Sequence, residues 1–145
     1  IPHMQLFSHD DKATALGRAP LFGNLARGDL VQLAMATEDL EVEAGKVLAR
    51  EGEIGQEFFV IVDGEVSVTR DGEEINRLGP GDFFGEIALI WDSPRRTATV
   101  TAATPVRFFV LTRQAFRGLI DHHPDIEAKV LEALEQRVQT TEDGV

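Results

Sequence analysis

The fold is decided by residues 58–78, which read FFVIVDGEVSVTRDGEEINRL. Phe58 to Val62 form an unbroken apolar run, which predicts a buried strand. Residues 66–69 then alternate between apolar and polar, as in a strand with one buried face. Asp71-Gly72 is a strong signal for a two-residue hairpin turn, and the apolar residues return at 75–78. The segment therefore predicts short strands joined by tight turns.

Similar strand signals lie on both sides of this segment, and glycines separate them. The further strands are expected at Leu40–Val42, Val47–Ala49, Thr97–Ala102 and Val106–Leu111. Glycine turns a chain through positive φ at little steric cost, so eight glycines are expected at the corners. They are Gly45, Gly52, Gly55, Gly64, Gly72, Gly79, Gly81 and Gly85. Short, evenly spaced strands of this kind predict a barrel, a jelly roll or a β-roll.

Helical patterns flank the strands. The stretch from Asp10 to Met35 is helical in pattern, and its strongest helix signal covers Asp29–Ala36. After the strands, Thr112 is expected to N-cap one helix, and Pro124 suits the first position of the next. The sequence thus predicts a mainly β fold with flanking helices: a β-roll (double-stranded β-helix or jelly roll) with N-terminal helices and two C-terminal helices.

The chain of 145 residues has the usual size of one domain. Residues 1–4 resemble an expression-tag remnant, so a single domain is expected over residues 5–145. The absence of cysteine excludes disulfides and thiolate metal sites and is consistent with a cytoplasmic protein.

The net charge of −11 argues against direct binding to nucleic acid or to an anionic membrane, since both need a basic surface. The longest apolar run, Phe58 to Val62, is far shorter than the roughly 20 residues of a membrane span. An acidic chain can still bind a small phosphate through a few local groups.

Residues 79–100, GPGDFFGEIALIWDSPRRTATV, break the strand pattern and carry the candidate chemistry. A single helical turn is expected at about Glu86–Trp91, and the glycines before it leave free N–H groups that favour an anion. Arg96 can grip a phosphate with paired hydrogen bonds, and Glu86 can accept from hydroxyl groups. Together these residues suit a ligand with one phosphate beside a vicinal sugar hydroxyl.

Two separated stretches resemble the cyclic nucleotide-binding domain family. The first is FGEIAL at residues 84–89 followed by RTATV at residues 96–100, which is similar to the family's phosphate-binding cassette. The second, residues 51–66, resembles its strand-and-glycine pattern. The family includes regulatory subunits of cAMP-dependent protein kinase, the catabolite activator protein and cyclic nucleotide-gated channels. The resemblance covers about residues 21–138.

The resemblance implies a role for each matching position. It implies that Glu86 accepts a hydrogen bond from the ribose 2′-hydroxyl and that Arg96 binds the phosphate. It also implies that the backbone of Gly85 approaches the sugar-phosphate closely. Thr97 and Ala98 would lie against the phosphate, Ala98 through its backbone N–H. The expected ligand-binding set is Gly85, Glu86, Ile87, Ala88, Arg96, Thr97 and Ala98.

Some assignments around this set stay open. Arg95 takes the phosphate instead of Arg96 if the loop is shifted by one residue. In the family a C-terminal helix often closes over the base, so Leu134, Arg137 or Val138 is a candidate cap, although the same helix can instead pack on the roll, on a second copy or on a partner protein. Trp91 is expected to pack beneath the loop, and His122-His123 to end a helix and not to bind metal.

The resemblance implies a non-enzymatic sensor whose ligand is cAMP or cGMP, with no metal cofactor. cAMP is favoured because it is the commoner ligand in the family, although a threonine at position 97 also occurs in cGMP-binding relatives. The alternatives are the ligand-binding half of a truncated transcription regulator, a scaffold that has lost its ligand, and a cupin-like metal enzyme. All four histidines lie near the ends of the chain, which disfavours the metal enzyme.

Overall fold

A computed structural model describes residues 9–89 and 95–138. The helices that precede the strands are α1 (His9–Leu16), η2 (Pro20–Phe22) and α2 (Arg27–Met35). The strands are β1 (Glu38–Val42), β2 (Val47–Ala49), β3 (Glu57–Asp63), β4 (Val66–Arg70), β5 (Glu73–Leu78), β6 (Phe83–Phe84), β7 (Thr99–Ala102) and β8 (Val106–Thr112). A short 3₁₀ turn, η3 (Glu86–Leu89), precedes β7, and α3 (Arg113–Asp121) and α4 (Pro124–Val138) follow β8.

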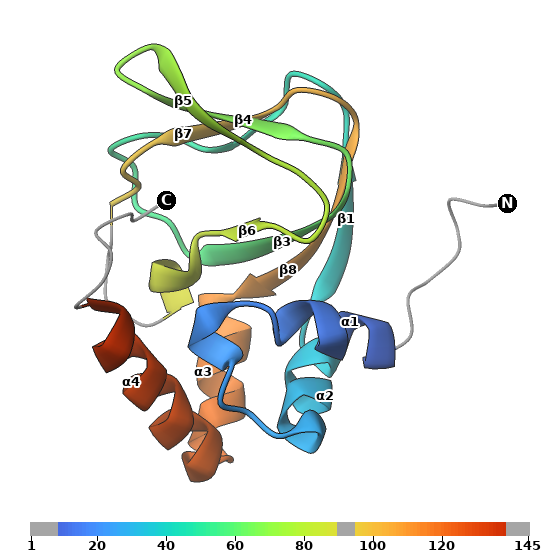
Figure 1. The fold of residues 1–145 in the computed structure, drawn as a ribbon, viewed down its shortest axis with the longest axis vertical. Coiled ribbons are helices and arrows are strands. Elements are labelled where there is room, and N and C mark those ends of the chain that lie inside the picture. Colours follow the sequence, from blue (N-terminus) through green and yellow to red (C-terminus); the bar gives the residue numbers. More distant parts are fainter. Residues whose placement is uncertain (1–8, 90–94, 139–145) are drawn as a thin grey trace, which may run out of the picture.

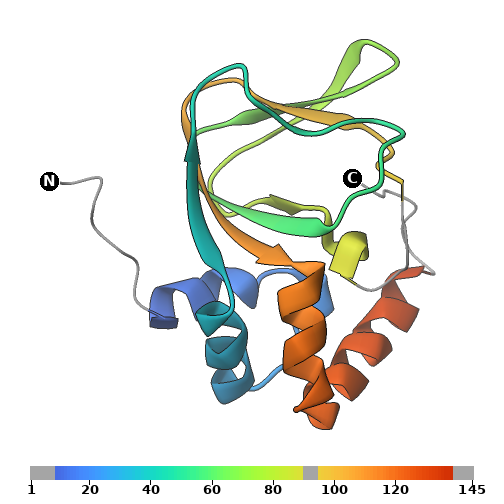
Figure 2. The ribbon, with the colours of Figure 1, turned by 180° about the vertical axis from the view of Figure 1, so that it is seen from behind.

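The strands form two antiparallel four-stranded sheets that face each other (Figure 1). One sheet has the order β1-β8-β3-β6, and the other has the order β2-β7-β4-β5. The helices of the described residues gather on the outer side of the first sheet, as the reverse view in Figure 2 also shows. The predicted fold class, a β-roll with N-terminal helices and two C-terminal helices, is confirmed.

Strand β3 is buried on both faces, which explains its unbroken apolar run. Phe58 and Val60 belong to the core between the first sheet and the helices, whereas Phe59 and Ile61 belong to the core between the sheets. Aromatic contacts mark both cores: Phe22 meets Phe58 edge-on at 5.7 Å, and Phe59 stacks on Phe84 at 4.6 Å. One strand thus fixes the helices and the second sheet relative to each other.

The predicted hairpin turn at Asp71-Gly72 is confirmed. Both residues have positive φ, 54° and 85°, as a type I′ turn requires, and Arg70 pairs with Glu73 across it. Arg77 on β5 forms ion pairs with Glu74 and Glu65, and its hydrogen bonds to Glu74 and then to Glu65 raise the pKa of its guanidinium.

The structure differs from the sequence prediction in three local features. Strand β6 was not predicted, because two residues cannot display a period and their pairing partners, Phe59 and Val60 of β3, are distant in the sequence. The strand expected from Thr97 begins at Thr99, since Thr97 and Ala98 form an irregular bend. The helix expected at Asp29–Ala36 starts two residues earlier, as α2.

The N-terminal cap of α3 is formed as predicted. The Thr112 hydroxyl oxygen accepts a hydrogen bond from the Ala115 N–H at 3.1 Å. We expect Thr112→Ala to lower the free energy of unfolding by about 1 kcal/mol, because one N–H of the first turn loses its partner. Denaturant titration measures the difference, and Thr112→Ser is the matched control that keeps the hydroxyl. An alanine variant as stable as the serine variant would contradict this role.

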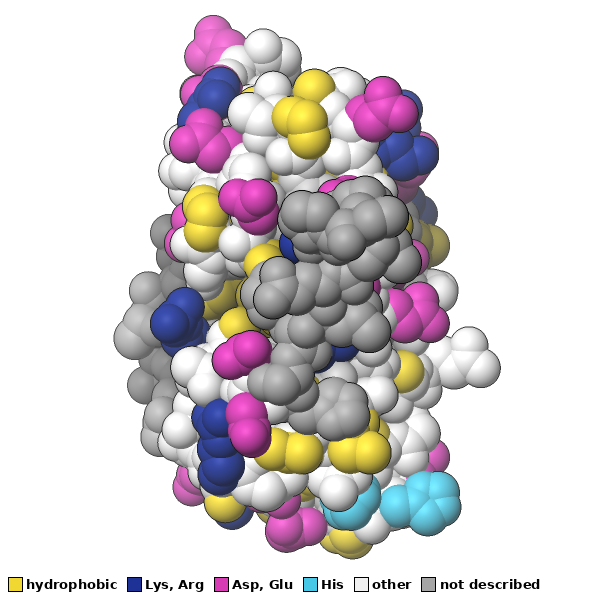
Figure 3. All heavy atoms as spheres, turned by 90° about the vertical axis from the view of Figure 1, so that its right-hand side faces the viewer, with side chains coloured by type: hydrophobic (Ala, Val, Ile, Leu, Met, Phe, Trp, Pro, Cys, Tyr) yellow, Lys and Arg dark blue, Asp and Glu magenta, His cyan; other side chains and the backbone are white. Residues whose placement is uncertain are grey.

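The α3–α4 junction lies where the sequence predicts it. His122 is the C-cap of α3, its Nδ1 lies 3.1 Å from the Gly118 carbonyl oxygen, and Pro124 begins α4. Figure 3 shows histidine side chains at the helical end of the molecule.

On the face drawn in Figure 3, Lys and Arg side chains are interspersed with Asp and Glu. Within the described ranges, no helix has both the length and the apolar character needed to cross a bilayer.

Candidate functional site

A hollow of about 200 Å³ opens beside strand β2, the loop that follows it, and the start of β3. Polar and apolar residues share its wall, and they include Val47, Leu48 and Ala49 of β2 together with Glu57 and Arg96. The remaining lining residues are Arg50, Glu53, Ile54 and Gly55. Arg96 comes from the segment that the sequence singles out, so the fold joins that segment to the 50–57 loop.

Arg96 is buried in this wall, with 6% of its surface exposed. Its backbone is fixed on both sides, because the Arg96 N–H donates to the Glu53 carbonyl oxygen and the Gly52 N–H donates to the Arg96 carbonyl oxygen, both at 2.8 Å. The guanidinium Nη2 donates to the Glu57 carbonyl oxygen at 3.0 Å and lies 3.6 Å from the Glu57 carboxylate. The fold thus holds a cation with its backbone and side chain both fixed.

Burial lowers the pKa of the Arg96 guanidinium, and the Glu57 carboxylate opposes that shift. An arginine begins from so high a pKa that it stays charged in proteins. A buried cation bordering an open hollow is poised to bind an anion, because desolvation strengthens its attraction for a charged ligand.

Two glycines make room for the guanidinium. A Cβ on Gly55 would overlap the Nε and Cζ atoms of Arg96. A Cβ on Gly85 would lie 2.6 Å from Arg96 Nη1 and 2.5 Å from the Glu57 carbonyl oxygen, and Gly85 also has a φ of 87°. Gly55 lies in the loop between β2 and β3, as expected, but its φ is not positive. Glycine is required there by the space that the Arg96 guanidinium occupies, and not by a left-handed backbone.

The two neighbouring arginines differ sharply in position. Arg95 is exposed and donates from Nη1 to the Gly52 carbonyl oxygen at 2.7 Å, outside the wall that Arg96 forms. Of the two residues that the sequence left open for the phosphate, Arg96 is the one that borders the hollow.

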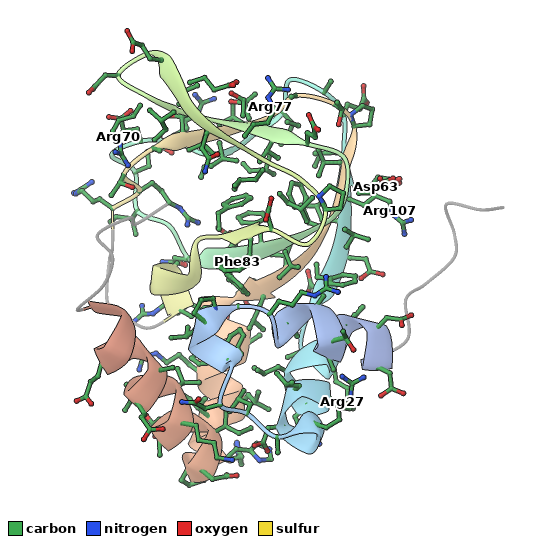
Figure 4. All side chains as sticks on the ribbon, in the orientation of Figure 1. Arg27, Asp63, Arg70, Arg77, Phe83 and Arg107 are labelled. Atoms are coloured by element: carbon green, nitrogen blue, oxygen red, sulfur yellow. The ribbon has the colours of Figure 1, made fainter. Side chains whose placement is uncertain are left out.

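The bend after Arg96 is held by a residue that the sequence did not indicate. Arg70, at the end of β4, donates from Nε to the Thr97 carbonyl oxygen at 2.9 Å and from Nη2 to the Thr97 hydroxyl at 3.4 Å. Thr97 is exposed and Ala98 is fully buried. Figure 4 shows Arg70 on the opposite side of the roll from Asp63 and Arg107. Because the peptide is planar and trans, anchoring the Thr97 carbonyl aims the Ala98 N–H away from Arg70.

The predicted helical turn forms as η3, which covers Glu86–Leu89 and follows the positive-φ Gly85. Ala88 and Leu89 are buried, and the Ala88 N–H donates to the Gly85 carbonyl oxygen at 3.0 Å. The side chains of five candidate residues lie outside the described part of the structure: Glu86, Ile87, Leu134, Arg137 and Val138. Trp91 lies outside it entirely.

The structure therefore brings Gly85 and Arg96 together, and adds Glu57, Gly55 and Arg70 around them. Glu57 and Arg70 carry no signal in the sequence, because their contacts with residues 96 and 97 span about 27 to 39 positions. Among the described residues, no three His, Asp or Glu side chains form a group suited to a metal ion.

Comparison with known proteins gives a consistent picture. The model of the cyclic nucleotide-binding domain matches residues 39–123, more than half of the chain. A cyclic nucleotide-gated potassium channel of Rhizobium etli is 40% identical over 119 residues, which cover 81% of this chain and 33% of the channel. A regulatory subunit of cAMP-dependent protein kinase from Eremothecium gossypii is 39% identical over 102 residues, covering 70% of this chain and 22% of that subunit. The chain thus spans a third or less of these relatives.

Solved structures with a similar fold agree with this family match. The N-terminal domain of a Streptomyces coelicolor transcriptional regulator superposes with a TM-score of 0.78 at 26% identity, covering 86% of this chain and 90% of that one. A cyclic nucleotide-binding-like protein from Brucella abortus gives 0.71 at 30% identity, covering 77% and 99%. The regulatory domain of Toxoplasma gondii PKA, crystallised with cAMP, gives 0.67 at 33% identity, covering 76% and 43%. The fold, the segment that carries Gly85 and Arg96, and the relatives all agree. This chain therefore belongs to the cyclic nucleotide-binding domain family.

Proposed function

We propose that this chain is a non-catalytic sensor that binds a cyclic nucleotide, cAMP in preference to cGMP, and responds by changing the position of α4. The observation that carries the proposal is the buried Arg96 guanidinium at the wall of the hollow. A cyclic phosphate carries one negative charge, and a fixed guanidinium is a suitable partner for it. The Toxoplasma gondii domain that was crystallised with cAMP supports the choice of base.

The sensor mechanism needs only a difference in affinity between two arrangements of the C-terminal helices. The turn η3 is linked to those helices through Leu89, which is fully buried in the same core as Phe116 and Val130. A ligand that reorders the residues beside Arg96 would therefore change the surface on which α3 and α4 pack. The output of α4 would be a contact with a second copy or with a partner protein.

The direct test is calorimetric titration of the purified chain with cAMP and separately with cGMP, after mass spectrometry has shown that no nucleotide co-purified. We expect one-to-one binding at micromolar concentration or tighter, with cAMP the tighter ligand. Amide hydrogen exchange with and without cAMP then tests the second half of the proposal, and we expect altered protection in α4. A folded, empty protein that gives no heat with either nucleotide would overturn the function and leave the fold unaffected.

Glu86 is the proposed acceptor for the ribose 2′-hydroxyl. We expect Glu86→Ala to weaken cAMP binding by roughly 10- to 100-fold, because a hydrogen bond to a charged group contributes about 1.5–3 kcal/mol. The affinity for 2′-deoxy-cAMP should hardly change, so the preference for the ribose ligand should disappear. Competition binding with the two nucleotides measures that preference, and an unchanged preference would remove Glu86 from this role.

A further inference from the structure

Glu57 presents two oxygens to the same nitrogen of Arg96. Its backbone carbonyl accepts a hydrogen bond from Arg96 Nη2 at 3.0 Å, and its carboxylate Oε1 lies 3.6 Å from that nitrogen. The two side chains differ in exposure: 6% of the Arg96 side chain is exposed, against 47% of the Glu57 side chain. The carboxylate therefore approaches the buried cation from the solvent side, and Glu57 is one of the residues that line the hollow.

We infer that Glu57 sets the affinity of the site for its ligand, because its carboxylate competes with the ligand phosphate for the Arg96 guanidinium. The inference rests on the proposed function, and it adds a residue that weakens binding to a site built to attract an anion. Placing a second anion at the same guanidinium brings two like charges close together in a partly desolvated wall, where their repulsion is stronger than in bulk water.

The sign of the effect does not depend on where the Glu57 carboxylate goes when the ligand enters. If the carboxylate stays beside Arg96, its attraction to the guanidinium is the same in the free and the bound protein. The bound protein then differs only by the repulsion between the carboxylate and the phosphate, which weakens binding. If it swings into solvent, binding must first break the ion pair. In both cases removal of the charge favours the complex.

Arg96 is held by contacts other than the one with the Glu57 carboxylate. The Nη2 hydrogen bond goes to the backbone carbonyl of Glu57, which a side-chain variant retains, and the Arg96 backbone is held by Gly52 and Glu53. Among the described lining residues, Glu53 is the other one with a carboxylate, and it bonds to Arg96 through its backbone carbonyl. A variant at Glu57 therefore changes charge while the guanidinium keeps its position.

The test compares cAMP binding by the wild-type chain, Glu57→Gln and Asp63→Asn. Asp63 lies at the other end of β3, roughly 20 Å from Glu57 along the strand. Its substitution by asparagine removes the same negative charge. Its carboxylate accepts from the Gly64 N–H, which an asparagine carbonyl can also do. We expect Glu57→Gln to bind cAMP about 3- to 10-fold more tightly than wild type, and Asp63→Asn to match wild type within about 2-fold.

Ionic strength separates a charge effect from a structural one. The gain in Glu57→Gln should shrink between about 0.05 M and about 0.5 M salt, because salt screens the repulsion that the variant removes. This inference would be overturned if the wild-type chain bound cAMP and the Glu57→Gln variant bound it equally well or more weakly. The proposed function would then still stand. If none of the three folded proteins bound cAMP or cGMP, the proposed function and this inference would both be overturned.

Discussion

Replacing Arg96 by alanine should weaken cAMP binding by roughly 10²–10³-fold or more, while the fold stays intact. The phosphate would then enter a hollow whose fixed cation is gone, and loss of one partner of a desolvated charge pair costs on the order of 3–5 kcal/mol. The fold should survive because the backbone bonds of residue 96 to Gly52 and Glu53 do not involve the side chain. Calorimetry measures the affinity, and thermal unfolding checks the fold.

Arg95→Ala is the matched control for that result. Arg95 is exposed and bonds to the Gly52 carbonyl, outside the wall of the hollow, so its loss should change affinity by no more than about 2- to 3-fold. Arg96→Lys should lie between the two, because it keeps the charge but loses the planar fork that matches a phosphate. If Arg96→Ala bound like wild type and Arg95→Ala did not, the phosphate role would pass to Arg95.

The second large loss of cAMP affinity is expected from a substitution at Gly55, a residue to which we assign no contact with the ligand. We expect Gly55→Ala to lower cAMP affinity by roughly 10- to 100-fold, because its Cβ would occupy the space of the Arg96 guanidinium and force it from its position. Overpacking of a filled site typically costs about 1–3 kcal/mol. The backbone of Gly55 can accept alanine, since its φ is not positive, so the effect should come from the displaced side chain.

Gly118→Ala is the control for this glycine substitution. Gly118 lies on α3, and a Cβ there would meet nothing within 4 Å. We expect unchanged affinity and a free energy of unfolding higher by up to about 1 kcal/mol, because alanine favours a helix over glycine. A Gly55→Ala protein that is folded and binds cAMP as wild type does would show that Arg96 need not hold the position seen here.

The sequence predicts those parts of the fold whose cause is local. The apolar run at Phe58–Val62 and the turn at Asp71-Gly72 are examples, since periodicity and positive φ act within a few residues. Strand β6 escaped prediction because its two residues become a strand only by pairing with β3. The order of helices, strands and helices followed from the local signals alone.

The site divides in the same way. Arg96 and Gly85 were predicted because they lie in one continuous segment that resembles a known family. Glu57 and Arg70 were not, because each acts on that segment from a distant strand. Gly55 was predicted only as one of the corner glycines. Its contact with the Arg96 guanidinium could not be predicted, because the two residues are far apart in the sequence.

Strand β3 has one further consequence, which concerns insertions and deletions. Its successive side chains alternate between the helix-facing core and the core between the sheets. A single residue added near Phe58 would shift the rest of the strand by one place and send each later side chain to the opposite layer. A residue added at the Asp71-Gly72 turn would only lengthen an exposed loop. Changes in chain length are therefore tolerated very unevenly along this domain, and the number of residues in β3 matters as much as their identity.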